Sequence, residues 1–342
     1  MADPTSLTKT GAGTAPPPAP APAPASGPGR AARMLDSGAG RNLGLVAVLV
    51  LLAIVGTVTA DTFLTTSNLL TILTSASIIG VLTVGVTFVI IGGGIDLSVG
   101  KVMALASVWA TTVATQSYGP LVMVLCALGV GAGAGLVNGL LIAYGRIVPF
   151  IVTLAALITA QGLAERISGR RSQIVVDPVI AGIATTRILG IPLLVYIFAV
   201  VVAIGWVVLN RTTFGRRTFA IGGNPEAARL AGLDVRRHTV ALYVVSGLCA
   251  GIAAIMIASL TTTGSSTHGT LYELDAIAAV IIGGTLLSGG RGTLIGSILG
   301  VLVFTTITNL FVLNNLATEV QNIAKGVIIV VAVLIQTRAR RD

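Results

Sequence analysis

The segment Gly92-Gly93-Gly94-Ile95-Asp96-Leu97-Ser98-Val99-Gly100 places one carboxylate inside a glycine cluster between two long apolar runs. An aspartate at membrane depth must be hydrogen-bonded or hydrated, and glycines allow tight turns or close helix contacts. We expect Asp96 to cap the helix that follows it by accepting an N–H bond from Ser98 or Val99. The alternative is a direct role of Asp96 in the path of a transported solute.

A second motif lies in residues 210–238, the longest charged stretch between apolar runs. Within it, Gly222-Gly223-Asn224-Pro225-Glu226-Ala227-Ala228-Arg229-Leu230-Ala231-Gly232 predicts a helix of two turns. Asn224 suits the N-cap, Pro225 the first helical position, and Gly232 can end the helix. Glu226 suits the positive helix start. So short a helix is marginal alone, which favours a partner surface; the alternative is a loop attracted to lipid headgroups.

Polar side chains inside apolar runs are candidates for a solute path, although such amides more often bond a neighbouring helix. Lys325 is the strongest of them because burying a charge is costly, but a salt bridge to Glu319 or a carbonyl would also satisfy it. The principal candidates are Asn138, Gln161, Asn309, Asn322 and Lys325, and Thr153, Glu165 and Gln321 have the same character.

No ATP-hydrolysing site is expected on this chain. A phosphate-binding loop has four residues between its glycines and Ser or Thr after the lysine. Here five residues separate Gly94 from Gly100, and Val102 follows Lys101.

Neither a metal site nor a catalytic residue is expected. Cys126 and Cys249 lie in separate apolar runs and read as core residues. We expect His238 and His268 to be solvated loop residues on opposite sides of the membrane.

The composition sets the class of protein that must position these motifs. Of 342 residues, 54% are hydrophobic and 10% are charged, against roughly 25% charged in soluble domains. This excludes a soluble enzyme. The net charge of +9 does not indicate nucleic acid as a partner, because most basic residues lie in short gaps between apolar runs.

Apolar runs near the length that spans a bilayer predict an all-α integral membrane protein with about ten transmembrane helices, in the range eight to ten. The eighth run is short and interrupted by glycine, so it could be a full span, a broken helix or a re-entrant segment. The predicted helices cover 43–61, 68–92, 98–117, 121–144, 148–168, 193–209, 238–260, 275–290, 294–313 and 319–336.

The remaining segments define the domain organisation and the orientation. Residues 1–42 are rich in Pro and Ala and predict a disordered cytoplasmic tail, 43–336 the membrane domain, and 337–342 a basic cytoplasmic tail. Counted on this scheme, sixteen basic residues, including Lys101, lie on the side of both termini and of residues 210–238, and four lie on the other. The positive-inside rule therefore predicts cytoplasmic termini.

Two similar segments predict an internal sequence repeat. Val89-Ile90-Ile91-Gly92-Gly93 recurs as Val280-Ile281-Ile282-Gly283-Gly284, and each copy is soon followed by Leu-Ser and a glycine. Paired, glycine-broken helices flank the solute path in many transporters. Chance similarity between two apolar segments is the alternative.

Three segments of the sequence resemble motifs of one known family. Glu226-Ala227-Ala228 followed by Gly232 resembles the E-A-A-x-x-x-G coupling loop of ATP-binding cassette (ABC) importer permeases. Residues 87–100, together with 273–284 and 289–292, resemble signatures of the ribose- and xylose-type sugar permeases. The resemblance covers residues 43–336.

This resemblance implies a permease subunit that imports a monosaccharide, ribose-type first, across a bacterial cell membrane. It implies three protein partners: a second permease subunit in a homodimer, a cytoplasmic ATPase that binds ATP and Mg, and an extracytoplasmic sugar-binding protein. It implies no cofactor on this chain. The coupling residues would be Asn224, Pro225, Glu226, Ala227, Ala228 and Gly232.

The alternative from another class is an ion- or proton-coupled secondary transporter. Such a carrier needs acids at the membrane midplane. Asp96, Glu273, Asp275 and Glu319 are all expected near helix ends instead, which leaves Glu165 as the doubtful case. A membrane-embedded enzyme would need converging catalytic groups, and the sequence shows no motif for them.

Overall fold

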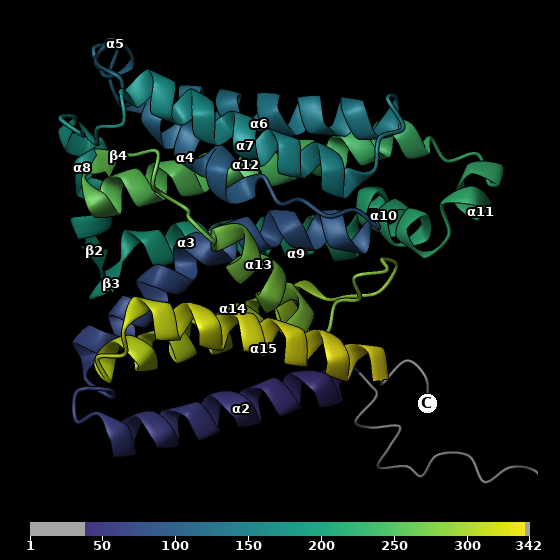
Figure 1. Ribbon diagram of the computed structural model, residues 1–342. Helices are drawn as coiled ribbons and strands as arrows, with labels where there is room; N and C mark the ends of the chain where they lie inside the picture. Colours follow the sequence, from purple (N-terminus) through teal and green to yellow (C-terminus); the bar gives the residue numbers. More distant parts are fainter. Residues whose placement is uncertain (1–37, 339–342) are drawn as a thin grey trace, which may run out of the picture.

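The computed structural model describes residues 38–338 and is built mainly from helices whose axes run roughly parallel (Figure 1). Most of the predicted N-terminal tail and part of the C-terminal tail lie outside the described residues. The long helices are α2 (Gly38–Thr59), α3 (Thr66–Ile91), α6 (Pro120–Ala143), α7 (Pro149–Ser168), α9 (Leu193–Arg211), α12 (Val235–Thr261), α14 (Leu294–Leu313) and α15 (Thr318–Arg338).

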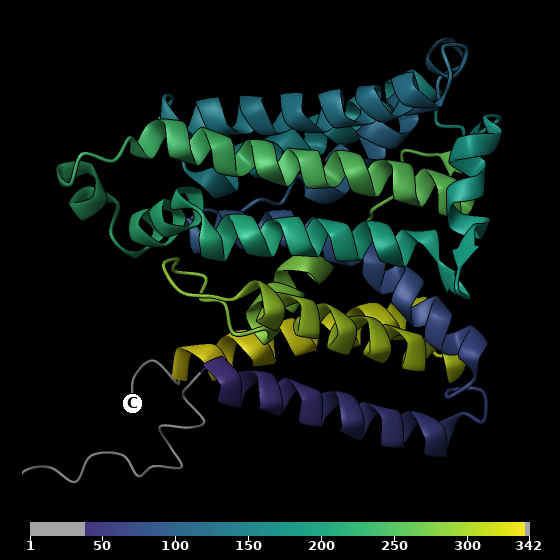
Figure 2. The ribbon, with the colours of Figure 1, turned by 180° about the vertical axis from the view of Figure 1, so that it is seen from behind.

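Shorter elements gather at the two ends of this bundle. At one end, the α5 end, lie α5 (Val113–Gln116), α8 (Pro178–Thr185) and two small antiparallel pairs, β1 (Gln173–Ile174) with β4 (Thr263–Gly264) and β2 (Arg187–Ile188) with β3 (Ile191–Pro192). At the other, the α11 end, lie α10 (Thr213–Gly223) and α11 (Pro225–Leu230) (Figures 1 and 2).

Seven helices within residues 38–338 are long and apolar enough to cross a membrane, namely α2 from Asn42 onward, α3, α6, α7, α9, α12 and α14. The chain is therefore an integral membrane protein. The predicted count of about ten transmembrane helices is not reached by this criterion and stays a prediction.

One predicted full-length helix, 98–117, is wrong, and the case left open, 275–290, is a short helix followed by a loop. The run 98–117 is interrupted at Thr111 and Thr112 and forms α4 (Val99–Ala110) and the single turn α5 (Val113–Gln116), where the Thr112 hydroxyl accepts the Thr115 N–H and caps α5. The run 275–290 forms α13 (Tyr272–Ile282), which ends at the C-cap Gly283, and residues 283–293 form a loop. With 12 and 11 residues, α4 and α13 have about half the length of α3, which has 26.

Residues 210–238 contain more helix than the sequence predicted. Helix α10 occupies 213–223, where Thr212 is the N-cap and its hydroxyl accepts the Gly215 N–H. The signal was present in the sequence, since the buried positions Gly215, Thr218 and Ile221 recur every three residues.

Helices α3 and α12 form the centre of the molecule, and α3 is buried along most of its length. The hydroxyl groups of threonines inside α3 form hydrogen bonds within the helix itself. The Thr83 hydroxyl donates to the Ile79 carbonyl (2.8 Å) and the Thr87 hydroxyl to the Thr83 carbonyl (2.6 Å). These bonds let threonine lie in an apolar interior without an unpaired donor.

Helices α6 and α12 pack with their backbones in direct contact. A Cβ added at Gly131 of α6 would lie 3.0 Å from the Gly251 nitrogen of α12, and one at Gly247 would lie 3.2 Å from Gly135 Cα. Glycines spaced four residues apart on both helices allow this approach, as in other membrane helix pairs. The α6–α12 pair is therefore fixed by main-chain contact.

Both ends of the described chain lie at the α11 end (Figure 1). This agrees with the prediction that the termini and residues 210–238 share one side of the membrane. Which side that is remains a prediction.

Candidate functional site

The glycine–aspartate loop, defined here as residues 92–98, connects α3 to α4 without regular structure. Gly92 is the C-cap of α3, and Gly93 follows with a φ of 85°, a conformation that favours glycine. The Gly94 N–H then bonds back to the Val89 carbonyl at 2.9 Å. This turn directs the chain from the α11 end back into the interior.

Asp96 is the centre of a buried hydrogen-bond network. Its side chain is 2% exposed; Oδ1 accepts from the Ser98 N–H (3.0 Å) and the Ser98 hydroxyl (2.6 Å). Oδ2 accepts from the Ser246 hydroxyl of α12 (2.8 Å), and Asn138 of α6 donates to the Ser98 hydroxyl at 3.0 Å. The predicted bond from Ser98 is confirmed, but the N-cap of α4 is Ser98 rather than Asp96, and Asp96 also bonds α12 directly.

The start of α13 forms a second polar cluster. Glu273 and Asp275 are buried there, and Asp275 pairs with Lys325 of α15 at 3.2 Å. Lys325 also lies 5.3 Å from the centre of the Phe304 ring. The suggested partners of Lys325, Glu319 or a carbonyl, were therefore wrong, because α13 brings a carboxylate closer than either.

Lys101 was also misplaced by the sequence prediction. It was counted among the basic residues on the cytoplasmic side, but in the first turn of α4 it is 8% exposed and donates to the Thr270 hydroxyl at 2.9 Å. This bond brings the starts of α4 and α13 together. Asp96, Glu273 and Asp275 do lie near helix ends, as predicted, but these ends are inside the molecule.

The five principal solute-path candidates do not converge. Asn309 exchanges two amide hydrogen bonds with Asn68 of α3 (2.8 and 3.1 Å), which makes it an interhelical tie. Gln161 donates to Glu165 on its own helix at 2.6 Å. Asn322 is exposed on α15. Of these five the structure brings Asn138 to the glycine–aspartate loop, and from the wider set Thr153 also reaches it, with its hydroxyl 3.4 Å from the Ile95 carbonyl.

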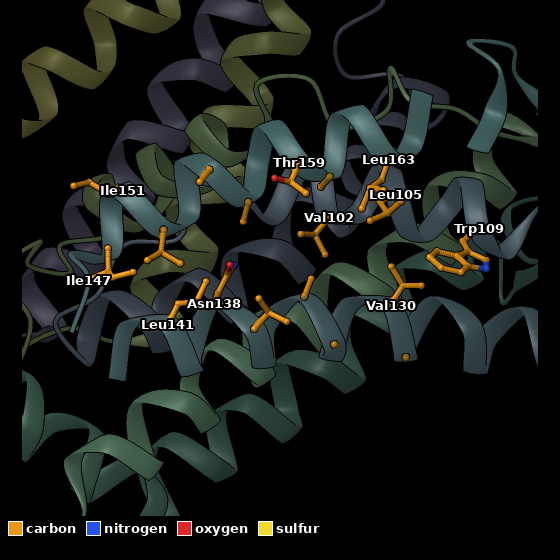
Figure 3. A pocket seen from close by; sticks show the side chains of 18 residues that line it. Val102, Leu105, Trp109, Val130, Asn138, Leu141, Ile147, Ile151, Thr159 and Leu163 are labelled. Carbon is orange, nitrogen blue, oxygen red and sulfur yellow. The ribbon is translucent and has the colours of Figure 1, made fainter. Parts of the chain in front are cut away.

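Asn138 also lines a cavity of about 620 Å3 between α4, α6 and α7 (Figure 3). Its wall is mostly apolar, and its polar groups are the side chains of Asn138 and Thr159 and the ring nitrogen of Trp109. Asn138 and Thr159 point toward the gap from facing helices in Figure 3. Thr159 was missed by the sequence analysis because nothing in the sequence distinguishes it from a threonine bonded within its own helix.

Helix α11 has the local structure that its sequence predicts. Asn224 is the N-cap and accepts the Ala227 N–H at 2.9 Å, Pro225 opens the helix, and Gly232 has a φ of 82°. The Arg229 guanidinium hydrogen-bonds the Glu226 carboxylate and thereby lowers its pKa. The helix ends at Leu230, slightly before the predicted position.

Most of α11 is exposed. Ala228 alone among its residues is buried, and Leu230 is 74% exposed. In both ribbon views α11 projects from its end of the molecule (Figures 1 and 2). The helix and its Glu226–Arg229 ion pair are therefore accessible to a partner.

A second cavity, of about 400 Å3, lies between the glycine–aspartate loop and the start of α11. Gly92, Gly93 and Gly94 line it from one side, and Pro225 and Ser288 also contribute. The cavity leaves free space between the predicted coupling helix and the loop that leads to Asp96.

The histidines are not solvated loop residues. His238 is 7% exposed in α12, lies against Phe214, and its Nε2 is 2.8 Å from the Thr218 hydroxyl of α10. His268 is half-buried, with ring nitrogens 3.3 Å from the hydroxyls of Ser107 and Thr261. Across the described part of the chain, no group of three or more His, Cys, Asp or Glu side chains is arranged to hold a metal ion.

Comparison with known proteins gives the family. Residues 68–333 match the family described as branched-chain amino acid transport system / permease component. The ribose import permease protein of Bacillus subtilis is 37% identical over 90% of this chain and 96% of its own length, and that of Escherichia coli is 36% identical over 86% and 92%. The galactose/methyl galactoside import permease protein of Escherichia coli is 35% identical over 85% and 92%.

No solved structure gives a significant match to the chain. The family match and the relatives both extend over most of the chain, and they agree with the three motifs that resemble importer permeases. The chain therefore belongs to the branched-chain amino acid transport system / permease component family.

Proposed function

We propose that this chain is the membrane-spanning permease subunit of an ABC importer that takes up a monosaccharide, with ribose as the first candidate. The proposal rests above all on α11, a capped and exposed helix with the coupling motif at one end of a membrane bundle. The names of the relatives support the sugar class, since they import ribose or galactose.

The partners follow from this function. A cytoplasmic ATPase, which binds ATP and Mg, would dock on α11, and an extracytoplasmic binding protein would deliver the sugar at the α5 end. A second copy of this chain would complete the membrane channel. The chain itself would need no cofactor.

We further propose that α4, α13 and α15 lie at membrane depth with the seven long helices, which gives ten membrane segments. The α11 end, with both termini, would face the cytoplasm. The proposed repeat is supported by matching turns. The Gly93 N–H bonds the Ile90 carbonyl and the Gly284 N–H bonds the Ile281 carbonyl, both at 2.9 Å.

For the solute path we favour the cavity between α4, α6 and α7. No charged side chain lines it, and Asn138 and Thr159 can hydrogen-bond sugar hydroxyls. A weakly polar wall binds a solute weakly, which allows the solute to be released during transport. The self-contained carrier is the weaker candidate, because family membership favours a subunit energised by a separate ATPase.

The sugar can be identified by its effect on ATP hydrolysis. The chain is reconstituted with its ATPase, and binding protein loaded with ribose or with galactose is added. Stimulation by the ribose-loaded protein alone is the expected result. Equal hydrolysis with and without every loaded binding protein would contradict the importer assignment.

The coupling role of α11 is tested with Glu226→Lys and Gly232→Val. Both should lower the amount of ATPase that co-purifies, the first by reversing a charge on the docking surface and the second by straining the turn that ends the helix. Gly190→Val is the matched control, because Gly190 has the same φ of 82° and open space but lies in the β2–β3 turn at the α5 end. Unchanged co-purification in both α11 variants would refute the coupling assignment.

Orientation is tested by labelling a single cysteine at position 229 in a variant without Cys126 and Cys249. We expect a membrane-impermeant reagent to reach it only after the cells are opened. Labelling of intact cells would reverse the proposed topology.

A further inference from the structure

Three glycine turns meet at the α11 end with their main chains in contact. The Gly290 N–H donates to the Ile91 carbonyl at 2.8 Å. A Cβ added at Gly222 would overlap that same carbonyl oxygen, and one at Gly289 would lie 2.8 Å from Gly93 Cα. No side chain separates the three turns. We call Ile91, Gly93, Gly222, Gly289 and Gly290 the glycine junction.

The junction connects three functional elements. Gly222 lies in the last turn of α10, directly before the residues that cap and open α11. Gly93 belongs to the glycine–aspartate loop, which leads to the Asp96 network. Gly289 and Gly290 lie in the loop between α13 and α14, so they follow the helix that carries Asp275.

Helix α11 has few other attachments to the bundle. Because only Ala228 is buried, a displacement of α11 can enter the bundle mainly through its two ends. One end leads through Gly223 to the glycine junction. The other leads through Gly232 and Leu233 to α12, whose N-cap is Asp234.

We infer that the glycine junction transmits the ATPase-driven displacement of α11 to both the glycine–aspartate loop and the α13–α14 loop. This inference rests on the proposed coupling role of α11. Main-chain contacts contain no side-chain rotamers that could absorb a small movement, so a shift of Gly222 must move the turns it touches. The 400 Å3 cavity beside the junction leaves room for that movement. Gly222 is thus a positioning residue that acts through the loops.

The first test compares Gly222→Ala with Gly223→Ala in the reconstituted complex. A Cβ at Gly222 would displace the junction, whereas a Cβ at Gly223 meets nothing within 4 Å. We expect Gly222→Ala to retain the ATPase and its hydrolysis but to lower sugar uptake by about tenfold, a typical size for coupling between sites. Gly223→Ala should match the wild type. Uptake is measured with radiolabelled ribose or galactose, whichever the wild-type complex transports.

A second pair of variants decides the matter even if Gly222→Ala fails to fold. Two glycines are inserted between Gly223 and Asn224, which loosens α11 from the junction without filling any space. The matched control carries the same insertion between Leu233 and Asp234, on the α12 side. We expect only the junction-side insertion to uncouple hydrolysis from uptake, with the ATPase still bound.

The outcomes separate this inference from the proposed function. Wild-type uptake in the junction-side insertion, or equal loss in both insertions, would overturn transmission through the junction while α11 remains the docking site. Loss of bound ATPase from the junction-side insertion would also overturn it, because the junction would then act in docking. Failure of the proposed function would appear instead as unchanged ATPase binding in Glu226→Lys and Gly232→Val.

Discussion

The two half-length helices, α4 and α13, differ in how the buried acid at the helix start is stabilised. Each begins inside the molecule after a non-helical stretch, and each has an acid at or near its start. Asp96, before α4, is satisfied by neutral donors from its own loop and from α12. Asp275 of α13 is satisfied by Lys325, a charge on α15. Both starts therefore depend on another helix, but α4 is held by neutral hydrogen bonds to the central helix α12, whereas α13 is held by an ion pair with α15.

The largest effect is expected from Asp96→Leu. This change leaves the buried donors of Ser98 and Ser246 without an acceptor, each at about 1–3 kcal/mol, so a loss of roughly 4 kcal/mol and of most folded protein should follow. Asp96→Asn keeps an acceptor oxygen and should cost about 1 kcal/mol. Monodisperse yield after detergent extraction and thermal unfolding measure both. A normal yield of Asp96→Leu would show that the start of α4 is not held by this network.

A somewhat smaller effect is expected when the α13 pair is broken. Lys325→Leu strands the buried Asp275 carboxylate and should destabilise the fold by about 3 kcal/mol. Asp275→Asn should be harmful too, but the double variant should be more stable than the sum of the single changes predicts. A thermal double-mutant cycle measures this coupling. Additive effects would mean that α13 does not depend on α15.

Asn138→Ala is expected to be milder than either. It removes one interhelical hydrogen bond to Ser98, worth about 1 kcal/mol, while the bonds from Ser98 and Ser246 to Asp96 remain. Yield should stay normal and the melting temperature should fall slightly. A collapse like that of Asp96→Leu would identify Asn138 as an essential part of the network.

The smallest effect on stability is expected from Asn322→Ala, since this side chain is exposed on α15. The change should lie within about 0.5 kcal/mol of the wild type in thermal unfolding. Sugar uptake is the more informative measurement. A large drop in uptake at normal stability would place α15 beside the solute and add transport to its role as the partner of α13.

How far the sequence predicted this molecule depended on the distance between interacting residues. The start of α11 was predictable because Asn224 and Pro225 act on their immediate neighbours. The bond between Asp96 and Ser246 and the pair between Asp275 and Lys325 were not, because only packing brings those helices together.

The length of α4 could not be read from composition, whereas the glycines after Ile282 had already left a broken helix open for α13. An apolar run of suitable length predicts a full span whether the chain in it is helical throughout or only in part. The positions at which the two helices start depend on tertiary contacts, such as the bond between Lys101 and Thr270 that joins the two starts. For the same reason, the polar residues of the membrane helices could be recognised in the sequence, but their hydrogen-bond partners could not be predicted.

The contact between α6 and α12 also provides a reference distance inside the molecule. Because Gly131 and Gly247 place the two main chains against each other, the separation of these helices cannot change without losing the contact. Paired spin labels on the exposed positions Leu125 and Leu248 should therefore report one distance in every nucleotide state. Distances from α6 to any other helix can be referred to that fixed length, which identifies the helices that shift during a transport cycle.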